Sequence, residues 1–182
     1  MTERLPDLSL TRNDGTPDSV GAHEGKVLLI VNTASQCGLT PQYAGLKALQ
    51  DRFGEQGFSV LAFPANDFGA QEPGTDAQIA QFCQTQFDVN FPVFAKASVA
   101  GADKQPLYKA LIAARPAKQG DTDGMRKMLE SHGIATNSDP EVLWNFEKFI
   151  VARDGRVLER FAPSTAPDDA ALIDVIEAAL RE

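Results

Sequence analysis

The sequence predicts a layered α/β fold, with a central mixed sheet flanked by helices. The runs Val27 to Val31 and Phe58 to Phe63 are short, apolar and unbroken, as strands buried inside a sheet are. Each is followed by a segment in which apolar residues recur at helical spacing. A strand pair and a last helix complete the chain, and such alternation places helices against a shared sheet.

The first half of the chain is expected to hold a hairpin, the two core strands and two helices. Short apolar pieces around the turn residues Asn13-Asp14-Gly15 predict the hairpin at the amino-terminal end. Apolar residues between 46 and 53 mark the first helix, and glycines at 54 and 57 end it. A capping-box pattern from Thr75 to Gln78 opens the second helix.

The second half contains a polar segment between its helix and its strands. Arg115 to Pro140 is interpreted as an insert into the domain that carries one short helix around residues 125–132. The other expected elements are a helix at 106–114, strands at 146–152 and 157–161 joined by a two-residue turn at Asp154-Gly155, and a last amphipathic helix that starts at Pro167-Asp168-Asp169.

Composition and length indicate one ordinary globular domain. The 182 residues fit a single domain, and the start M-T-E-R-L-P-D-L-S-L lacks the regions of a signal peptide. The net charge of −8 disfavours nucleic acid and anionic membranes as partners. Two cysteines do not form the disulfide framework of a secreted protein. We therefore expect one cytoplasmic domain over residues 1–182.

Cys37 lies in the stretch that is most informative about chemistry. It follows a buried strand and precedes a predicted helix start, with Thr40 as N-cap and Pro41 as the first helical residue. Ligands gather at the carboxyl ends of strands in α/β sheets, and a helix amino terminus favours thiolate over thiol. Threonine at position 40 excludes a C-x-x-C dithiol. The pattern predicts a single reactive thiolate.

Three blocks of sequence resemble the signatures of the glutathione peroxidase family. They are N-T-A-S-Q-C-G-L-T at 32–40, F-P-A-N-D-F-G-A-Q-E-P-G at 63–74 and W-N-F-E-K-F at 144–149. The resemblance covers nearly the whole chain and implies a thioredoxin-like fold that reduces hydroperoxides. It implies that Cys37 is the peroxidatic residue, a cysteine where some relatives carry selenocysteine. It also implies that Gln71, Trp144 and Asn145 complete the catalytic tetrad.

These residue types suit the chemistry that the resemblance implies. Indole N–H and carboxamide NH₂ groups donate hydrogen bonds without titrating near neutral pH. Aimed at sulfur and at the departing oxygen, they stabilise developing negative charge, as an oxyanion hole does. The second block departs from the family's usual F-P-C-N-Q-F at Ala65 and Asp67. A carboxylate at 67 would disfavour the thiolate if it lay close to it.

Cys83 has two interpretations. It shares a helix face with Ile79 and Phe87, which is typical of a packed core residue. The segment F-C-Q-T-Q-F-D-V-N-F-P-V-F also resembles the one that holds the resolving cysteine of the two-cysteine, thioredoxin-dependent branch of the family. His23 and His132 are interpreted as surface residues. Neither has metal-ligand spacing, so no metal or cofactor is expected.

The sequence and the resemblance together predict a thiol peroxidase for hydrogen peroxide or organic hydroperoxides. Cys37 would become a sulfenic acid and condense with Cys83, and thioredoxin would reduce the disulfide. Two alternatives stay open: glutathione as direct reductant with Cys83 structural, or a peroxide sensor that passes its oxidation to a partner protein. The insert at 115–140 is either a solvated loop or a segment with a role in assembly or in docking of the reductant. The helix carrying Cys83 is expected to open during turnover, because a buried Cys83 cannot meet an exposed Cys37.

Overall fold

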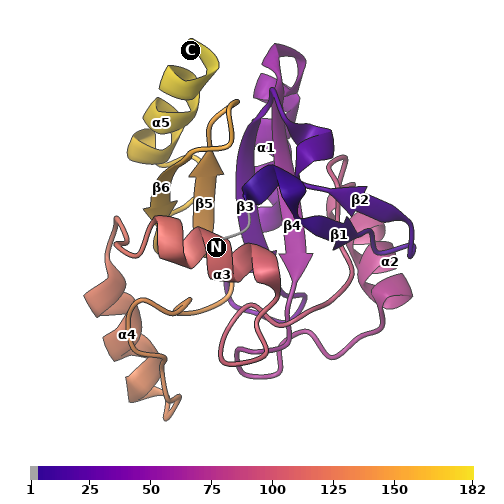
Figure 1. Ribbon diagram of the computed structural model, residues 1–182. Coiled ribbons are helices and arrows are strands. Elements are labelled where there is room, and N and C mark those ends of the chain that lie inside the picture. The colour runs from indigo at the N-terminus through magenta and orange to yellow at the C-terminus, as the bar shows by residue number, and fades with distance from the viewer. Residues whose placement is uncertain (1–3) are drawn as a thin grey trace.

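The computed structural model describes residues 4–182 and contains a four-stranded mixed sheet, a separate two-stranded hairpin and five α-helices (Figure 1). The strands are β1 (Ser9–Thr11), β2 (Pro17–Ser19), β3 (Val27–Thr33), β4 (Phe58–Pro64), β5 (Lys148–Val151) and β6 (Val157–Phe161). The helices are α1 (Gln42–Phe53), α2 (Asp76–Phe87), α3 (Pro106–Ala114), α4 (Thr122–Ser131) and α5 (Ala170–Leu180). The predicted α/β class and amino-terminal hairpin are confirmed.

The main sheet has the strand order β4-β3-β5-β6. β3 and β4 run parallel, with Ile30 opposite Leu61, whereas β5 pairs antiparallel with β3 and places Phe149 opposite Ile30. Every residue of β3 and β4 is buried, which is why both strands read as continuous apolar runs rather than alternating ones. The parallel pair brings the carboxyl ends of β3 and β4 to the same edge of the sheet.

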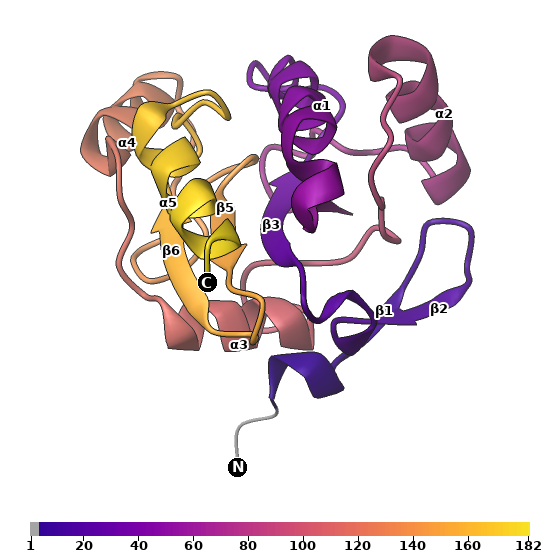
Figure 2. The same cartoon turned by 90° about the horizontal axis from the view of Figure 1, so that it is seen from above.

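Helices cover both faces of this sheet. α1 and α5 lie on one face and α3 lies on the other, while α2 stands beyond α1 at the margin of the molecule (Figures 1 and 2). α3 packs through Tyr108, whose ring meets Phe63 of β4 at 6.0 Å and Phe149 of β5 at 6.1 Å between centroids. No helix within residues 4–182 is long and apolar enough to cross a membrane.

α2 has the predicted start and a distinct end. Thr75 and Gln78 form the reciprocal capping box, so this prediction is confirmed. The helix ends at Phe87, and the next residue, Asp88, takes the left-handed conformation at φ 48°. The partly buried rings of Phe82 and Phe87 pack on Tyr43 of α1, at 6.5 and 5.3 Å between centroids. Aromatic packing on one helix therefore anchors α2.

Two expected boundaries near β5 are wrong. The strand begins at Lys148 rather than at Phe146, because Phe146 has φ 70° and its N–H turns to Asn32 O at 2.7 Å. The turn into β6 has three residues instead of two. Ala152 N donates to Arg156 O at 2.8 Å, and Gly155 closes the turn with φ 90°. The extra residue fits a type I turn followed by a left-handed glycine.

The polar segment 115–140 lies along the free side of β6 and beyond it. Gln119 pairs with this strand, because its N–H donates to Arg160 O and its carbonyl accepts from Ala162 N, both at 2.8 Å. α4 projects past α3 in Figure 1, yet Met125 and Leu129 on one of its faces are buried. The segment thus covers the sheet edge that β6 would otherwise expose.

Candidate active site

The loop after β3 holds Cys37 in place through a threonine hydroxyl. Thr40 Oγ1 accepts the N–H of Cys37 at 3.0 Å and donates to Ala34 O at 2.8 Å. The prediction that Thr40 caps the next helix is therefore wrong, because its hydroxyl is used within the loop. α1 starts at Gln42 without a side-chain cap, and Pro41 precedes it. The hydroxyl closes the cysteine loop instead.

The Cys37 thiol lies just beneath the surface at the carboxyl edge of β3 and β4. The residue is 8% exposed, and its neighbours Gln36 and Gly38 are exposed. Its Sγ accepts the N–H of Leu39 at 3.3 Å. This contact and the Thr40 hydrogen bond fix the position of the sulfur within the loop. A small oxidant thus has a short path to a thiol whose surroundings are fixed.

Gln71 connects this loop to the segment that follows β4. Its carbonyl accepts the N–H of Gln36 at 3.0 Å, so the two loops run side by side next to Cys37. Its side-chain Oε1 accepts from Asn145 Nδ2 at 2.9 Å. Asn145 is fully buried before β5. The structure therefore joins two of the predicted site residues by a side-chain hydrogen bond and ties one of them to the cysteine loop.

Trp144 packs against the glycine-containing turn after β4. Its ring lies 5.7 Å from Phe68 between centroids, and a Cβ added at Gly69 would come within 3.0 Å of Trp144 Cη2. Gly69 has φ 67°, so both the close approach and the backbone conformation require glycine there. The Trp144 carbonyl accepts from Asn32 Nδ2 at 3.0 Å. Trp144 is thus fixed at the same sheet edge as the cysteine loop.

Gln71, Trp144 and Asn145 surround the site without bonding to the sulfur. Within residues 4–182, no hydrogen bond links the Cys37 thiol to these three side chains. Their contacts are with one another and with main chain near the loop. The arrangement can offer carboxamide and indole donors to a small molecule bound beside Cys37, since catalytic hydrogen bonds often tighten only around the substrate.

Asp67 and Ala65, where the sequence departs from the family pattern, both have structural roles. The Asp67 carboxylate accepts from Ser98 Oγ at 2.8 Å and from Val99 N at 2.7 Å, so it fixes the segment after residue 97. Ala65 is buried, and its N–H donates to Thr33 O at 3.1 Å. A carboxylate that accepts two hydrogen bonds there is engaged away from the sulfur.

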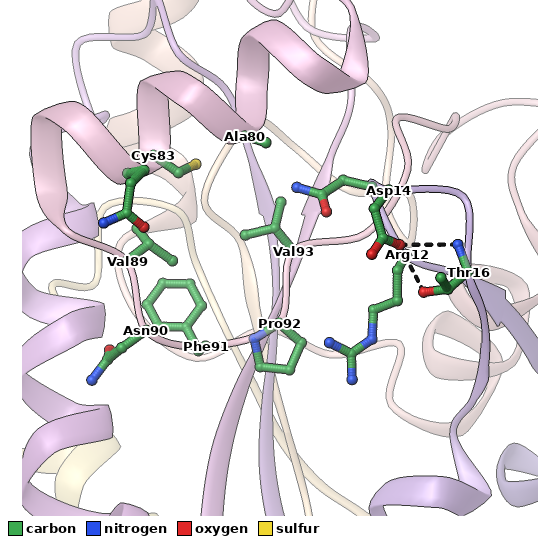
Figure 3. A pocket seen from close by; sticks show the side chains of 12 residues that line it. Arg12, Asp14, Thr16, Ala80, Cys83, Val89, Asn90, Phe91, Pro92 and Val93 are labelled. Atoms are coloured by element: carbon green, nitrogen blue, oxygen red, sulfur yellow. Dashed lines mark hydrogen bonds between the residues drawn. The ribbon is translucent and has the colours of Figure 1, made fainter.

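Cys83 lies on the buried side of α2 and is only 2% exposed. It forms one wall of a surface pocket of about 450 Å³, whose opposite wall comes from Arg12, Asp14 and Thr16 around the hairpin (Figure 3). Burial raises the pKa of the Cys83 thiol, and the nearby Tyr43 opposes this. Both cysteines are free thiols. Cys83 is therefore packed in the core of the reduced protein, as one of its two interpretations predicts.

Sequence reasoning missed several buried polar side chains, among them His23, Lys148 and Glu72. His23, interpreted as a surface residue, is buried and lies 2.9 Å from Asp18, so that prediction is wrong; His132 is exposed as expected. Lys148 is fully buried, and Glu72, the residue after Gln71, is 1% exposed. No local pattern marks these residues, because their burial depends on segments distant in sequence. Within residues 4–182, no cluster of three His, Cys, Asp or Glu side chains could hold a metal ion.

Solved structures with the same architecture define the fold. The apo form of Trgpx superposes with a TM-score of 0.72 and 31% identity over 99% of this chain and 97% of that chain. A thiol:disulfide interchange protein of the thioredoxin family from Chlorobium tepidum TLS gives a TM-score of 0.57 at 15% identity over 99% and 97%. The fold is therefore thioredoxin-like, as the resemblance implied.

The comparison of sequences defines the family. The sequence model described as Glutathione peroxidase matches residues 5–112. Thioredoxin/glutathione peroxidase BtuE of Escherichia coli is 45% identical over 170 residues, 93% of each chain. Hydroperoxy fatty acid reductase gpx1 of Synechocystis sp. is 47% identical over 87% of this chain and 86% of that protein, and glutathione peroxidase-like peroxiredoxin HYR1 of Saccharomyces cerevisiae is 44% identical over 92% and 91%. The chain belongs to the glutathione peroxidase family and is a thiol peroxidase.

Proposed function

We propose that this peroxidase reduces hydrogen peroxide and organic hydroperoxides by a two-cysteine cycle that thioredoxin completes. The observation that carries the proposal is the junction at the carboxyl edge of β3 and β4. There a backbone hydrogen bond of 3.0 Å from Gln36 N to Gln71 O joins the Cys37 loop to Gln71. The side chain of Gln71 in turn accepts a hydrogen bond of 2.9 Å from the side chain of Asn145. When the O–O bond of a peroxide breaks, negative charge develops on the departing oxygen. Hydrogen-bond donors that do not titrate, held beside a fixed thiol, can stabilise that charge.

In the first step the Cys37 thiolate attacks one peroxide oxygen. An S–O bond forms and the O–O bond breaks, and the second oxygen leaves as water or an alcohol after it takes a proton. Cys37 becomes a sulfenic acid. The indole N–H of Trp144 and the amides of Gln71 and Asn145 stabilise the charge that develops on the departing oxygen.

In the second step Cys83 attacks the oxidised sulfur of Cys37. A disulfide forms and the sulfenic oxygen leaves as water. Thioredoxin then reduces the disulfide by thiol–disulfide exchange. The name thioredoxin/glutathione peroxidase for the related BtuE supports this class of reductant. The name hydroperoxy fatty acid reductase for the Synechocystis relative supports organic hydroperoxides as substrates.

The second step requires α2 to open. A disulfide needs the two Cα atoms within about 4.4–6.8 Å of each other. In the reduced protein Cys83 instead faces the core and the pocket beside the hairpin. α2 is a peripheral helix with exposed glutamines at 81, 84 and 86. Opening such a unit costs less than global unfolding.

Two alternatives predict different kinetics. If glutathione is the direct reductant, Cys83 is core filling, a role that its packing beside Ile79 would suit. If the protein is a peroxide sensor, Cys37 oxidises once and passes the oxidation to a partner.

Peroxide consumption with each reductant separates the three cycles. We expect turnover with thioredoxin and its reductase, and none after Cys37→Ser. Cys83→Ser and the apolar control Cys83→Ala should each trap one sulfenic acid per chain and fail to cycle with thioredoxin. Normal thioredoxin turnover by both variants would contradict the two-cysteine cycle. Turnover with glutathione alone would support the first alternative, and a single oxidation without turnover the second.

A further inference from the structure

Lys148, the first residue of β5, carries an amine inside the protein. The residue is fully buried, and within residues 4–182 no carboxylate forms a salt bridge with it. Its neighbour Phe149 contacts Tyr108 of α3, so the Lys148 side chain lies on the opposite face of the sheet, which α1 and α5 cover (Figure 2). A buried amine without an ion pair costs stability. The proposed cycle has so far given this group no role.

The amine of Lys148 joins two main-chain carbonyls from separate segments. Its Nζ donates to Phe146 O at 2.6 Å and to Pro163 O at 3.1 Å. Phe146 directly follows the two residues Trp144 and Asn145, called the donor pair below, and Pro163 lies in the turn after β6. Lys148 therefore connects the segment that carries the donor pair to this turn.

The same turn also holds the start of α1. Pro163 O accepts a second hydrogen bond, from Gln42 Nε2 at 3.0 Å. Gln42 is the first residue of α1, and its N–H donates to Leu39 O at 2.8 Å, within the Cys37 loop. The carbonyl of Pro163 is thus a shared acceptor. It links the end of the Cys37 loop to Lys148, and through Lys148 to the donor pair.

The backbone after the donor pair needs support of this kind. Phe146 has φ 70°, a left-handed conformation that costs energy for a residue other than glycine and persists only where the surroundings hold it. Its N–H donates to Asn32 O at 2.7 Å, and Asn32 Nδ2 donates to Trp144 O at 3.0 Å. Lys148 holds the remaining polar group, the Phe146 carbonyl. Loss of that bond lets the peptide after Phe146 turn and the donor pair shift with it.

We infer that Lys148 is a positioning residue for the oxidation of Cys37, because it holds the donor pair in place against the Cys37 loop through the shared carbonyl of Pro163. This inference rests on the proposed function, in which the donor pair stabilises the departing oxygen, and it deepens the first step. Lys148 acts through the main chain and touches neither the peroxide nor the sulfur. A misplacement of about 1 Å at a reacting centre can cost about 10²-fold in rate.

The test measures Cys37 oxidation by stopped flow with hydrogen peroxide in the full chain. Lys148→Met keeps an unbranched side chain of similar length and removes both hydrogen bonds to the carbonyls. We expect oxidation to slow by about 10²-fold. Leu172→Ala is the control for lost packing, since Leu172 is fully buried on α5, over the same face of the sheet. It should lower the free energy of unfolding and leave the oxidation rate unchanged.

Two further readouts separate positioning from a general loosening of the fold. If Lys148 acts through the donor pair, Lys148→Met in an Asn145→Ala background should slow oxidation by less than about tenfold, whereas independent effects would multiply in full. Trp144 is the only tryptophan of the chain, so its fluorescence reports the position of the donor pair in the folded protein. The emission should shift in Lys148→Met and stay unchanged in Leu172→Ala.

A wild-type oxidation rate in Lys148→Met would overturn the inference, as would full multiplication of the two rate losses or an unchanged Trp144 emission. If Lys148→Met does not fold, Gln42→Leu, which removes the other donor to the shared carbonyl, replaces it with the same expected and overturning results. A wild-type oxidation rate in Asn145→Ala would instead refute the donors of the proposed function, and this inference with them. That result is distinct from a slowed Asn145→Ala beside an unaffected Lys148→Met, which would refute the positioning role alone.

Discussion

Removing the cap of α2 should speed the second oxidation step. Thr75 Oγ1 accepts the N–H of Gln78 at 3.2 Å, and Gln78 Oε1 accepts the N–H of Thr75 at 2.9 Å. Loss of such a cap costs a helix about 1 kcal/mol. If α2 must open before Cys83 attacks, Thr75→Ala raises the open population about fivefold. Disulfide formation should then accelerate about fivefold, with Cys37 oxidation unchanged.

A cap on another helix provides the matched control. Asp169 accepts the N–H of Ala171 at 2.9 Å at the start of α5. Asp169→Ala should therefore lower the free energy of unfolding by a similar amount and leave disulfide formation at the wild-type rate. Asp88→Gly gives the opposite perturbation, because glycine accepts the left-handed conformation that ends α2, at φ 48°, without steric cost. Asp88→Gly should therefore slow disulfide formation between Cys37 and Cys83.

Hydrogen exchange provides the independent measurement of opening. Amides of α2, Asp76–Phe87, should exchange faster in Thr75→Ala and more slowly in Asp88→Gly, while amides of β3 and β4 stay protected. The reasoning is refuted if exchange in α2 accelerates in Thr75→Ala and the rate of disulfide formation does not. In that case α2 opens without limiting the attack of Cys83.

Three further predictions concern the site and its support. Asn145→Ala removes the partner of Gln71 and should slow Cys37 oxidation by about 10²-fold, measured by stopped flow; a wild-type rate would exclude Asn145 from the site. Thr40→Val removes both hydrogen bonds of the hydroxyl, so it should lower the free energy of unfolding by about 1–3 kcal/mol and slow Cys37 oxidation. Thr40→Ser keeps the hydroxyl and should keep the wild-type stability and oxidation rate. Burial lowers the pKa of Lys148 to about 7, so between this value and about 10.4 the unfolded chain binds more protons and stability rises with pH. Urea unfolding at several pH values should show this rise in wild type relative to Lys148→Met, and a constant difference between the two would contradict it.

The sequence by itself determined the elements whose signals are local. β3 and β4 are continuous apolar runs because both of their faces are covered, and α2 begins at a capping box formed within four residues. The order of elements specified the α/β class, and the three family blocks specified the residues that the peroxidase proposal uses. A parallel β3–β4 pair also requires that Cys37 and Gln71 emerge at one edge, since both follow the carboxyl end of a strand.

Only the tertiary structure decided how the loops and buried polar groups are used. Thr40 resembles an N-cap in sequence, but its hydroxyl finds the N–H of Cys37 and the carbonyl of Ala34 in the folded loop. Phe146 fits a strand pattern, yet its N–H bonds Asn32 O, more than 100 residues earlier, and β5 starts later. Glu72 would be exposed in most loops. It is 1% exposed here, with Ser35 of the Cys37 loop beside its carboxyl, and a contact between segments distant in sequence leaves no periodicity in the chain.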